Sequence, residues 1–128
     1  MAISLYYTAR RKKNLDQKEI SAVQHIVQRY SVNEQIEKYL MTGEGLNWAS
    51  FDFSLNVKTG NVFRKGIVLS GSTQLPDSDE NASWIGVQYW CQCLSEIRTA
   101  LTHCEWRVTI EDHSIPWDAE AKAYSPTR

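Results

Sequence analysis

The chain has 128 residues, of which 42% are hydrophobic and 23% are charged, so it fits one globular domain over residues 1–128 and not a disordered chain. Lys and Arg total 14 against 15 Asp and Glu, for a formal net charge of −1. This near-balance argues against a nucleic-acid partner, because dedicated nucleic-acid-binding proteins usually carry a basic excess. Five Trp residues are many for this length, and they are candidates for a binding surface.

The cysteines and the apolar stretches indicate the compartment. Three cysteines, at Cys91, Cys93 and Cys104, are an odd number, which favours reduced thiols over a disulfide framework. No apolar stretch approaches the roughly 20 residues of a membrane helix. The only basic run, residues 10–13, follows the first apolar residues, the reverse of a secretory signal. We therefore predict a cytoplasmic protein with no membrane partner, and residues 10–13 as a solvated loop.

The first half of the chain predicts one strand and two helices. Residues 3–8 alternate as a strand, with Ile3, Leu5 and Tyr7 on one face. A capping box of Asp16 and Glu19 begins a helix. The same signature at residues 31–34 begins a second, shorter helix that ends at Gly43 or Gly45. The apolar face of the second helix is expected at Ile36, Tyr39 and Leu40.

The second half predicts a hairpin, a long helix and a last strand. Residues 49–57 alternate as a strand and residues 62–69 return as its partner after a turn at 58–61. Residues 70–81, rich in Gly, Ser, Pro and acids, are predicted as a loop. A helix begins at Ala82, and its buried stripe is predicted at Trp84, Val87, Cys91, Leu94, Ile97 or Arg98, and Leu101. Residues 106–110 form a strand that buries its even positions, and residues 111–128 form a tail that wraps the surface.

This order, β-α-α-β-β-α-β, predicts the fold class. An α+β domain with a four-stranded antiparallel sheet and two main helices on one face satisfies it, in the manner of a ferredoxin-like sandwich. The handedness rule for crossover connections favours placing the first and last strands centrally or side by side.

The cysteines and histidines are candidate ligands for a metal ion. Cys91, Cys93, His103 and Cys104 are zinc-ligand types, but residues two apart on a helix point about 200° apart and cannot converge on one ion. We therefore predict no metal and no cofactor.

A cysteine nucleophile with a histidine base is the second possibility. Nothing in the chain marks an activated thiol, such as a cysteine at a helix N-terminus, and Cys93 is expected on the open face of its helix as an unreactive thiol. The candidate bases would be His25, His103 and His113. We predict no catalytic residue and a protein that is not an enzyme.

Acidic residues near the C-terminus are the more suggestive feature. Residues 105–120 hold five acids and one base, Arg107, which is either an ordinary acidic surface or a patch for a basic protein partner. Trp117 lies among these acids and either packs back as a lid on the sheet or stands out as an anchor. Trp84, Trp90 and Trp106 are expected to pack. The candidate partner-binding residues are Glu111, Asp112, His113, Trp117, Asp118, Glu120 and a second boundary tryptophan, Trp48.

Three segments carry a family resemblance: residues 3–10, 43–48 and 112–118 look like segments of small single-domain bacterial proteins. In general character the chain resembles the immunity proteins of polymorphic and contact-dependent growth inhibition toxin systems. The resemblance implies a compact, cytosolic, cofactor-free protein that neutralises a cognate toxin domain by direct binding. It assigns no binding residue, and the near-neutral charge departs from the strongly acidic immunity proteins that act against nuclease toxins.

Two other classes of function stay open. The chain is alternatively a small enzyme or small-molecule binder that uses the open face of the sheet, with Tyr6, Thr8 and Arg107 as its polar groups. It is alternatively a structural subunit whose exposed sheet face forms a homodimer.

Overall fold

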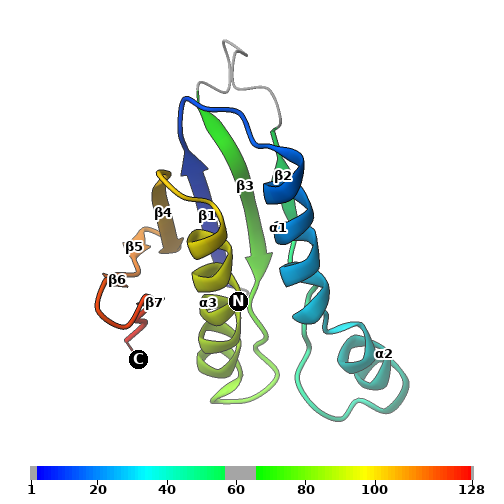
Figure 1. Cartoon of the computed structure of the whole chain (residues 1–128). Coiled ribbons are helices and arrows are strands. Elements are labelled where there is room, and N and C mark those ends of the chain that lie inside the picture. The colour runs from blue at the N-terminus through cyan, green and yellow to red at the C-terminus, as the bar shows by residue number, and fades with distance from the viewer. Residues whose placement is uncertain (1–2, 57–65, 128) are drawn as a thin grey trace.

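The computed structural model describes residues 3–56 and 66–127, which fold as an antiparallel sheet with α1 and α3 packed side by side on one face (Figure 1). The described residues form a five-stranded sheet in the order β2-β3-β1-β4-β5 and a two-stranded sheet of β6 and β7. The elements are β1 (Ser4–Arg10), α1 (Gln17–Arg29), α2 (Asn33–Thr42), β2 (Phe53–Leu55), β3 (Ile67–Gln74), α3 (Ala82–Ala100), β4 (Glu105–Ile110), β5 (His113–Ser114), β6 (Trp117–Asp118) and β7 (Ala123–Tyr124). The α+β class and the antiparallel sheet are confirmed, but the sheet has five strands where the sequence predicted four.

Strand β1 is at the centre of the sheet and pairs with β3 on one side and β4 on the other. Leu5, Tyr7 and Ala9 are buried under the helices, whereas Tyr6 points to the open face and is exposed. The predicted alternation is thus confirmed for Leu5 and Tyr7. Ile3 was predicted on the buried face, but it precedes the strand and is 39% exposed.

The predicted capping box opens α1. The Glu19 amide donates to Asp16 Oδ1 at 2.8 Å, and the Asp16 amide donates to Glu19 Oε1 at 3.0 Å. Glu19 also receives two hydrogen bonds from Arg11, through Nη1 at 2.7 Å and Nη2 at 2.5 Å. The prediction that the basic run is only a solvated loop is therefore wrong at Arg11, whose side chain is buried and also donates to the carbonyls of Lys13, Asn14 and Thr102.

This ion pair predicts a loss of stability in acid. The hydrogen bonds from Arg11 lower the pKa of Glu19 from 4.5 to about 2, so the folded state prefers the charged carboxylate. The stabilisation is present above the pKa of the unfolded chain and is lost as the pH falls from about 4.5 towards 2. Urea unfolding at pH 6 and pH 2.5 should show that Glu19→Gln reduces this acid-dependent loss by at least ~1 kcal/mol. Glu37→Gln, on exposed α2, should leave the loss as in the wild type, and an equal effect of both variants would refute the assignment.

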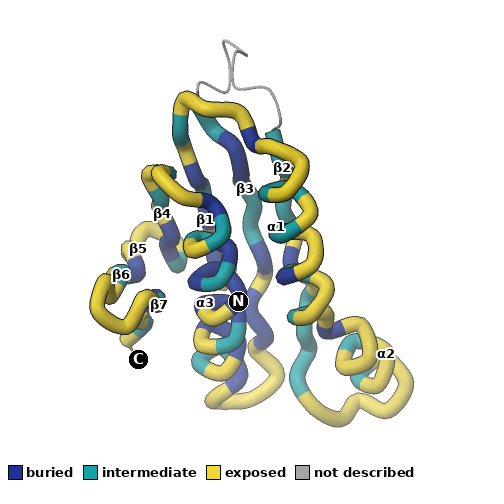
Figure 2. The backbone as a smooth tube through the Cα atoms, viewed as in Figure 1, coloured by how far each residue is buried: buried dark blue, intermediate teal, exposed yellow. Residues whose placement is uncertain are grey.

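Helix α2 projects from the body of the molecule (Figure 2). It ends as predicted at Gly43, which takes a left-handed φ of 71°, but its N-cap is Val32 and makes no side-chain cap bond, so the capping signature predicted at residues 31–34 is not used. No residue of Asn33–Thr42, all of them described, is buried. Leu40, predicted on the packed face, is 78% exposed, because the helix turns only its Ile36 and Tyr39 side inward.

The predicted antiparallel pairing of β2 with β3 is present. Residues 49–52, predicted as the beginning of the first strand, are not in a strand, and the second strand runs further than expected. Phe53 pairs with Gly71 and Leu55 with Leu69, and β3 continues to Gln74, so the prediction of a loop from residue 70 is wrong. This polar stretch is a strand because central β1 needs a partner along its whole length. The predicted turn at 58–61 and the start of the returning strand at 62–65 lie outside the described residues.

Helix α3 forms the middle of the core, with Trp90 fully buried. Of the predicted stripe, Val87, Cys91, Leu94, Ile97 and Leu101 are buried. Trp84 is half-buried against the core, as is Trp106 of β4. Cys93, predicted on the open face, is 0% exposed. The reason is that α3 is covered on more than one side, by the sheet, by α1 and by β7.

The C-terminal part of the chain is ordered into short strands. Strand β4 buries Val108, as predicted, but Thr109 is buried as well, because β5 pairs with it on the outer side. Tyr124 of β7 is buried, and its amide donates to Ser95 Oγ of α3 at 2.9 Å. This contact ties residues 123–124 to the helix layer. Within the described residues, none of the helices is both long and apolar enough to cross a membrane.

Candidate functional site

An apolar groove with an acidic rim lies where β1 begins and β4 ends. It is lined by Ile3, by residues 110–116 and by Pro126 and Thr127, and encloses about 490 Å³. We call it the Ile3 groove. It contains three of the residues that the sequence singled out for partner binding, Glu111, Asp112 and His113.

The floor of the Ile3 groove continues the core face of the sheet. Leu5 pairs with Ile110 and Tyr7 with Val108, so all four share the face that the helices cover. Leu5 and Val108 are buried, whereas Ile110 is half-buried and Ile3 is exposed. The alternation thus keeps isoleucine on this face beyond the part that is fully covered. Sequence reasoning missed this floor, although the period-2 pattern of β1 and β4 carried the signal.

The rim is the turn at Glu111 and Asp112. Glu111 takes a φ of 53°, a left-handed conformation that costs a non-glycine residue about 1 kcal/mol. It is held by Ser4, whose amide donates to Glu111 Oε1 at 3.2 Å and whose carbonyl accepts from the Glu111 amide at 3.3 Å. Asp112 and His113 make a 3.0 Å contact between Oδ1 and Nδ1 and are 92% and 88% exposed. One carboxylate is therefore fixed against β1 and the other reaches into solvent.

Trp117 and the remaining acids lie on the β6–β7 hairpin, outside the lining of the Ile3 groove. The guanidinium of Arg98 stacks over the Trp117 ring at 4.2 Å, and the Tyr124 ring meets it edge-on at 5.0 Å. Trp117 therefore packs back, although it does so onto α3 and not as a lid on the sheet. Asp118 Oδ1 accepts hydrogen bonds from the amides of Glu120 and Ala121 at 3.0 and 3.1 Å, which fixes the turn, and the Glu120 side chain is exposed.

Trp48 belongs to a third place in the molecule. Its ring packs edge-on against Tyr89 at 5.2 Å and Trp90 at 5.9 Å, so it extends the aromatic core of α3. The structure therefore divides the predicted partner-binding residues among the Ile3 groove, the β6–β7 hairpin and this aromatic cluster.

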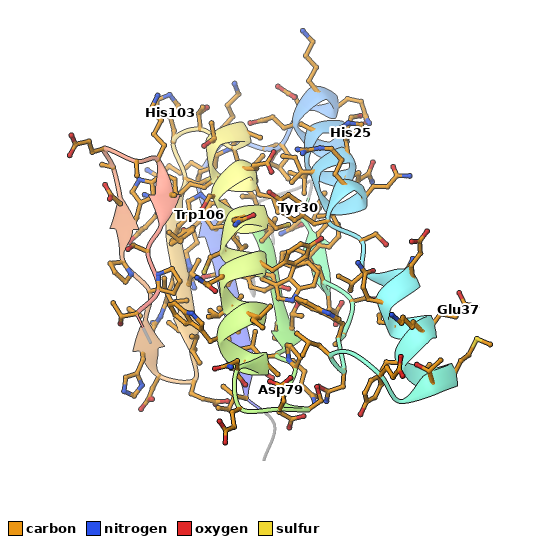
Figure 3. All side chains as sticks on the ribbon, turned by 90° about the horizontal axis from the view of Figure 1, so that it is seen from below. His25, Tyr30, Glu37, Asp79, His103 and Trp106 are labelled. Atoms are coloured by element: carbon orange, nitrogen blue, oxygen red, sulfur yellow. The ribbon has the colours of Figure 1, made fainter. Side chains whose placement is uncertain are left out.

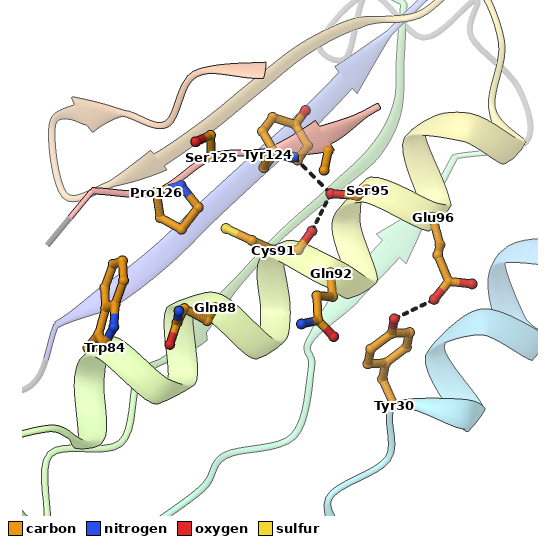
Figure 4. A pocket seen from close by; sticks show the side chains of 11 residues that line it. Tyr30, Trp84, Gln88, Cys91, Gln92, Ser95, Glu96, Tyr124, Ser125 and Pro126 are labelled. Atoms are coloured by element: carbon orange, nitrogen blue, oxygen red, sulfur yellow. Dashed lines mark hydrogen bonds between the residues drawn. The ribbon is translucent and has the colours of Figure 1, made fainter. Parts of the chain in front are cut away.

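A second groove of about 460 Å³ runs along α3 beside residues 123–126 (Figure 4). Two of its polar side chains, Ser95 and Glu96, are already engaged. Ser95 Oγ donates to the Cys91 carbonyl at 2.6 Å and accepts from the Tyr124 amide. Glu96 receives hydrogen bonds from the Tyr30 hydroxyl and from Arg29. A nucleophile needs a base beside it and a free position for the reacting atom, and the Ser95 hydroxyl has neither here.

The thiols are placed for packing. Burial raises the pKa of Cys91 and of Cys93 to about 12, and burial also raises the pKa of Cys104. The thiolate form that attacks substrates is therefore disfavoured near neutral pH. Figure 3 shows His25 on α1 and His103 before β4 at separate edges of the molecule. Within residues 3–56 and 66–127, no group of three or more His, Cys, Asp or Glu side chains could hold a metal ion.

The open face of the sheet carries the other predicted polar groups. Thr8 pairs with Arg107 and Tyr6 with Thr109, so these four side chains are neighbours on the face without helices. Tyr6 and Arg107 are exposed and Thr8 is half-buried. The register thus brings together the three residues, Tyr6, Thr8 and Arg107, that the sequence proposed for a small-molecule site.

No family model, curated protein or solved structure matches this chain. What its surfaces can bind therefore rests on their own geometry.

Proposed function

We propose that this protein is a non-enzymatic protein-binding module, an immunity protein that neutralises a cognate bacterial toxin domain by direct binding in the cytoplasm. The observation that carries the proposal is the Ile3 groove, in which an apolar floor meets an acidic rim. Apolar area supplies affinity in protein interfaces, while complementary charge speeds and orients association.

The charge of the groove supports a basic partner. Its described lining contains Glu111 and Asp112 and no Lys or Arg. The engaged Ser95 hydroxyl of the α3 groove and the buried thiols support binding over catalysis.

We also propose that the fold is a ferredoxin-like sandwich enlarged by α2 and by β5–β7. The strand order β2-β3-β1-β4 is the one expected for β-α-β-β-α-β connectivity.

A growth-rescue assay with single charge reversals tests the function. The toxin domain to co-express with this chain is the C-terminal domain of a large secreted protein, to be sought in the reading frame directly upstream. We expect wild-type protein to restore growth and Asp112→Lys to weaken binding of the toxin domain about tenfold, the loss expected when a like charge faces a basic partner. Asp112 is suited to the test because it is almost fully exposed, so its reversal should leave the unfolding curve unchanged. Asp118 is unsuited because it holds a turn through two backbone amides.

Glu37→Lys is the matched control for this assay. It makes the same charge change on α2, where Figure 3 shows the Glu37 side chain on the outer side of the helix. If wild-type protein gives no rescue, the proposed function is wrong. If Asp112→Lys and Glu37→Lys bind alike, the function stands but the groove is not the interface.

The open sheet face favours a second candidate, a small-molecule binder with Tyr6, Thr8 and Arg107 as its polar groups. Arg107 could pair with an anionic group while the hydroxyls orient the ligand. The same face would alternatively serve a homodimer. Light scattering at two protein concentrations separates the homodimer from the small-molecule binder, because only a homodimer would show a molar mass that changes with concentration.

A further inference from the structure

We infer that the Ile3 groove binds an extended segment of its protein partner in which an apolar side chain is flanked by Lys or Arg. This inference rests on the proposed protein-binding function and names the partner chemistry of that same site. The apolar side chain would rest on Ile3, Ile110 and Ile115, and the cations would meet the carboxylates of Glu111 and Asp112.

The floor fits one apolar side chain and not a polar one. Ile3, directly before β1, and Ile110 and Ile115, from the continuous segment 110–116, meet in one cavity of about 490 Å³. The prolines at 116 and 126 complete its walls. Ile3 is 39% exposed and Ile110 is half-buried, while Ile115 is buried beneath them. Apolar surface left in contact with water beside prolines in this way marks interaction sites. A partner side chain that removes this surface from water would regain that free energy.

The rim fits cations. Glu111 is held by Ser4 through one carboxylate oxygen, Oε1, and Asp112 Oδ1 lies 3.0 Å from Nδ1 of its neighbour His113. Two carboxylates therefore stand beside the floor on a turn whose backbone conformation is set by β1. No Lys or Arg is among the described residues that line the groove, so none of these residues balances this negative charge.

The place of the groove favours an extended segment over a helix. It runs beside β5, which is the terminal strand in the order β2-β3-β1-β4-β5. The outer edge of such a strand presents backbone groups that pair with extended chains. Successive side chains of an extended segment point to opposite sides. In a segment with one apolar residue between two cations, the apolar side chain would therefore face the floor and the two cationic side chains would face the rim.

Blocked peptides test the inference without the toxin. The probes are acetyl-Gly-Lys-Leu-Lys-Gly-amide and two matched peptides in which Glu replaces both Lys or Ser replaces Leu. Binding to the full chain is followed by the NMR shifts of the backbone amides of residues 110–114. We expect saturable shifts with the Lys-Leu-Lys peptide, and affinities at least about tenfold lower for the Glu and Ser peptides.

Variants of the protein complete the design. Asp112→Lys should weaken the Lys-Leu-Lys peptide about fivefold, Ile3→Ser should weaken it by a similar factor, and Glu37→Lys should leave it unchanged. The inference is overturned if no amide of residues 110–114 shifts saturably, if the three peptides bind alike, or if Asp112→Lys binds as the wild type. Peptide binding in a chain that gives no growth rescue would reject the toxin function and keep the partner chemistry. Rescue without peptide binding would do the reverse.

Discussion

Gly71→Ala is expected to lower the free energy of unfolding by about 3 kcal/mol or more, because close-packed cores tolerate added atoms poorly. Gly71 lies in the middle of β3, where β2 and β1 pass on either side. A Cβ at this position would lie 2.1 Å from the Asp52 carbonyl oxygen, 2.7 Å from the Tyr7 ring and 2.9 Å from Phe53 Cα. Two of these three atoms belong to the backbone and cannot rotate away.

A hydrogen-bonded network behind Gly71 makes the clash harder to relieve. The Tyr7 hydroxyl donates to the Asp52 carbonyl and lies 2.7 Å from Thr73 Oγ1, which accepts from the Asp52 amide at 3.2 Å. Moving Asp52 away from a new methyl group would break its two part-buried bonds, to the Tyr7 hydroxyl and to Thr73 Oγ1. Each costs about 1 to 3 kcal/mol when a buried partner is left unpaired. The steric and the hydrogen-bonding effects therefore act in the same direction.

Urea or guanidinium unfolding measures the effect of Gly71→Ala directly. Ser72→Ala is the matched control, since the neighbouring residue in β3 turns to the open face beside Tyr6 and changes by loss of one hydroxyl. We expect the control to lie within about 0.5 kcal/mol of the wild type. A loss below about 1 kcal/mol for Gly71→Ala would mean that β2 and β3 are not in the register described, because the clash depends on Gly71 facing Phe53.

Trp90→Ala should destabilise the fold by about 3 to 5 kcal/mol, the range for removing a large aromatic side chain from a core. Trp90 is fully buried at the middle of α3. Its ring contacts three other aromatic rings, with centroid distances of 4.9 Å to Tyr89, 5.4 Å to Phe51 and 5.9 Å to Trp48. Alanine would leave a cavity where the helix layer, the sheet and the Trp48 segment meet.

The indole N–H of Trp90 helps to design the control. Among the described residues it has no hydrogen-bond partner, so the stabilisation comes from packing and not from this donor. Trp90→Phe should therefore recover more than half of the loss, whereas a loss equal to that of alanine would point to an essential N–H contact. Trp84→Ala, on the same helix but only half-buried, should cost clearly less than Trp90→Ala by chemical denaturation.

The elements that sequence reasoning placed correctly depend on contacts close along the chain. The capping box of Asp16 and Glu19 is a pair of bonds across three residues, so it is readable without knowing what surrounds the helix. The alternation of Leu5 and Tyr7 likewise follows from the pleat of a strand. The α+β class follows from the order of such local patterns. It was therefore predicted correctly although the bounds of single elements were wrong.

The surfaces depended on contacts between distant parts of the chain. The helical spacing predicts that Cys93 is exposed. It is buried because α1 and the C-terminal segment also pack against α3. The composition of residues 70–74 predicts a loop, but these residues form a strand because they pair with β1. The helical spacing predicts that Leu40 is packed, but α2 projects from the body of the molecule and Leu40 is exposed to solvent. In each case burial is a property of the neighbours and not of the local pattern.

The tryptophan excess and the acidic C-terminal stretch show the same division. Composition and position along the chain were sufficient to single out Trp48, Trp117 and the acids around residues 111–120 as candidates. Tertiary packing decided that Trp48 joins the core aromatics, that Trp117 lies under Arg98, and that Glu111 and Asp112 border an apolar groove. The alternation of a strand determines which of its residues share a face. How much of that face is covered depends on the length and position of helices that are distant in the sequence. The Ile3 groove lies where the helices no longer cover the core face of β1 and β4.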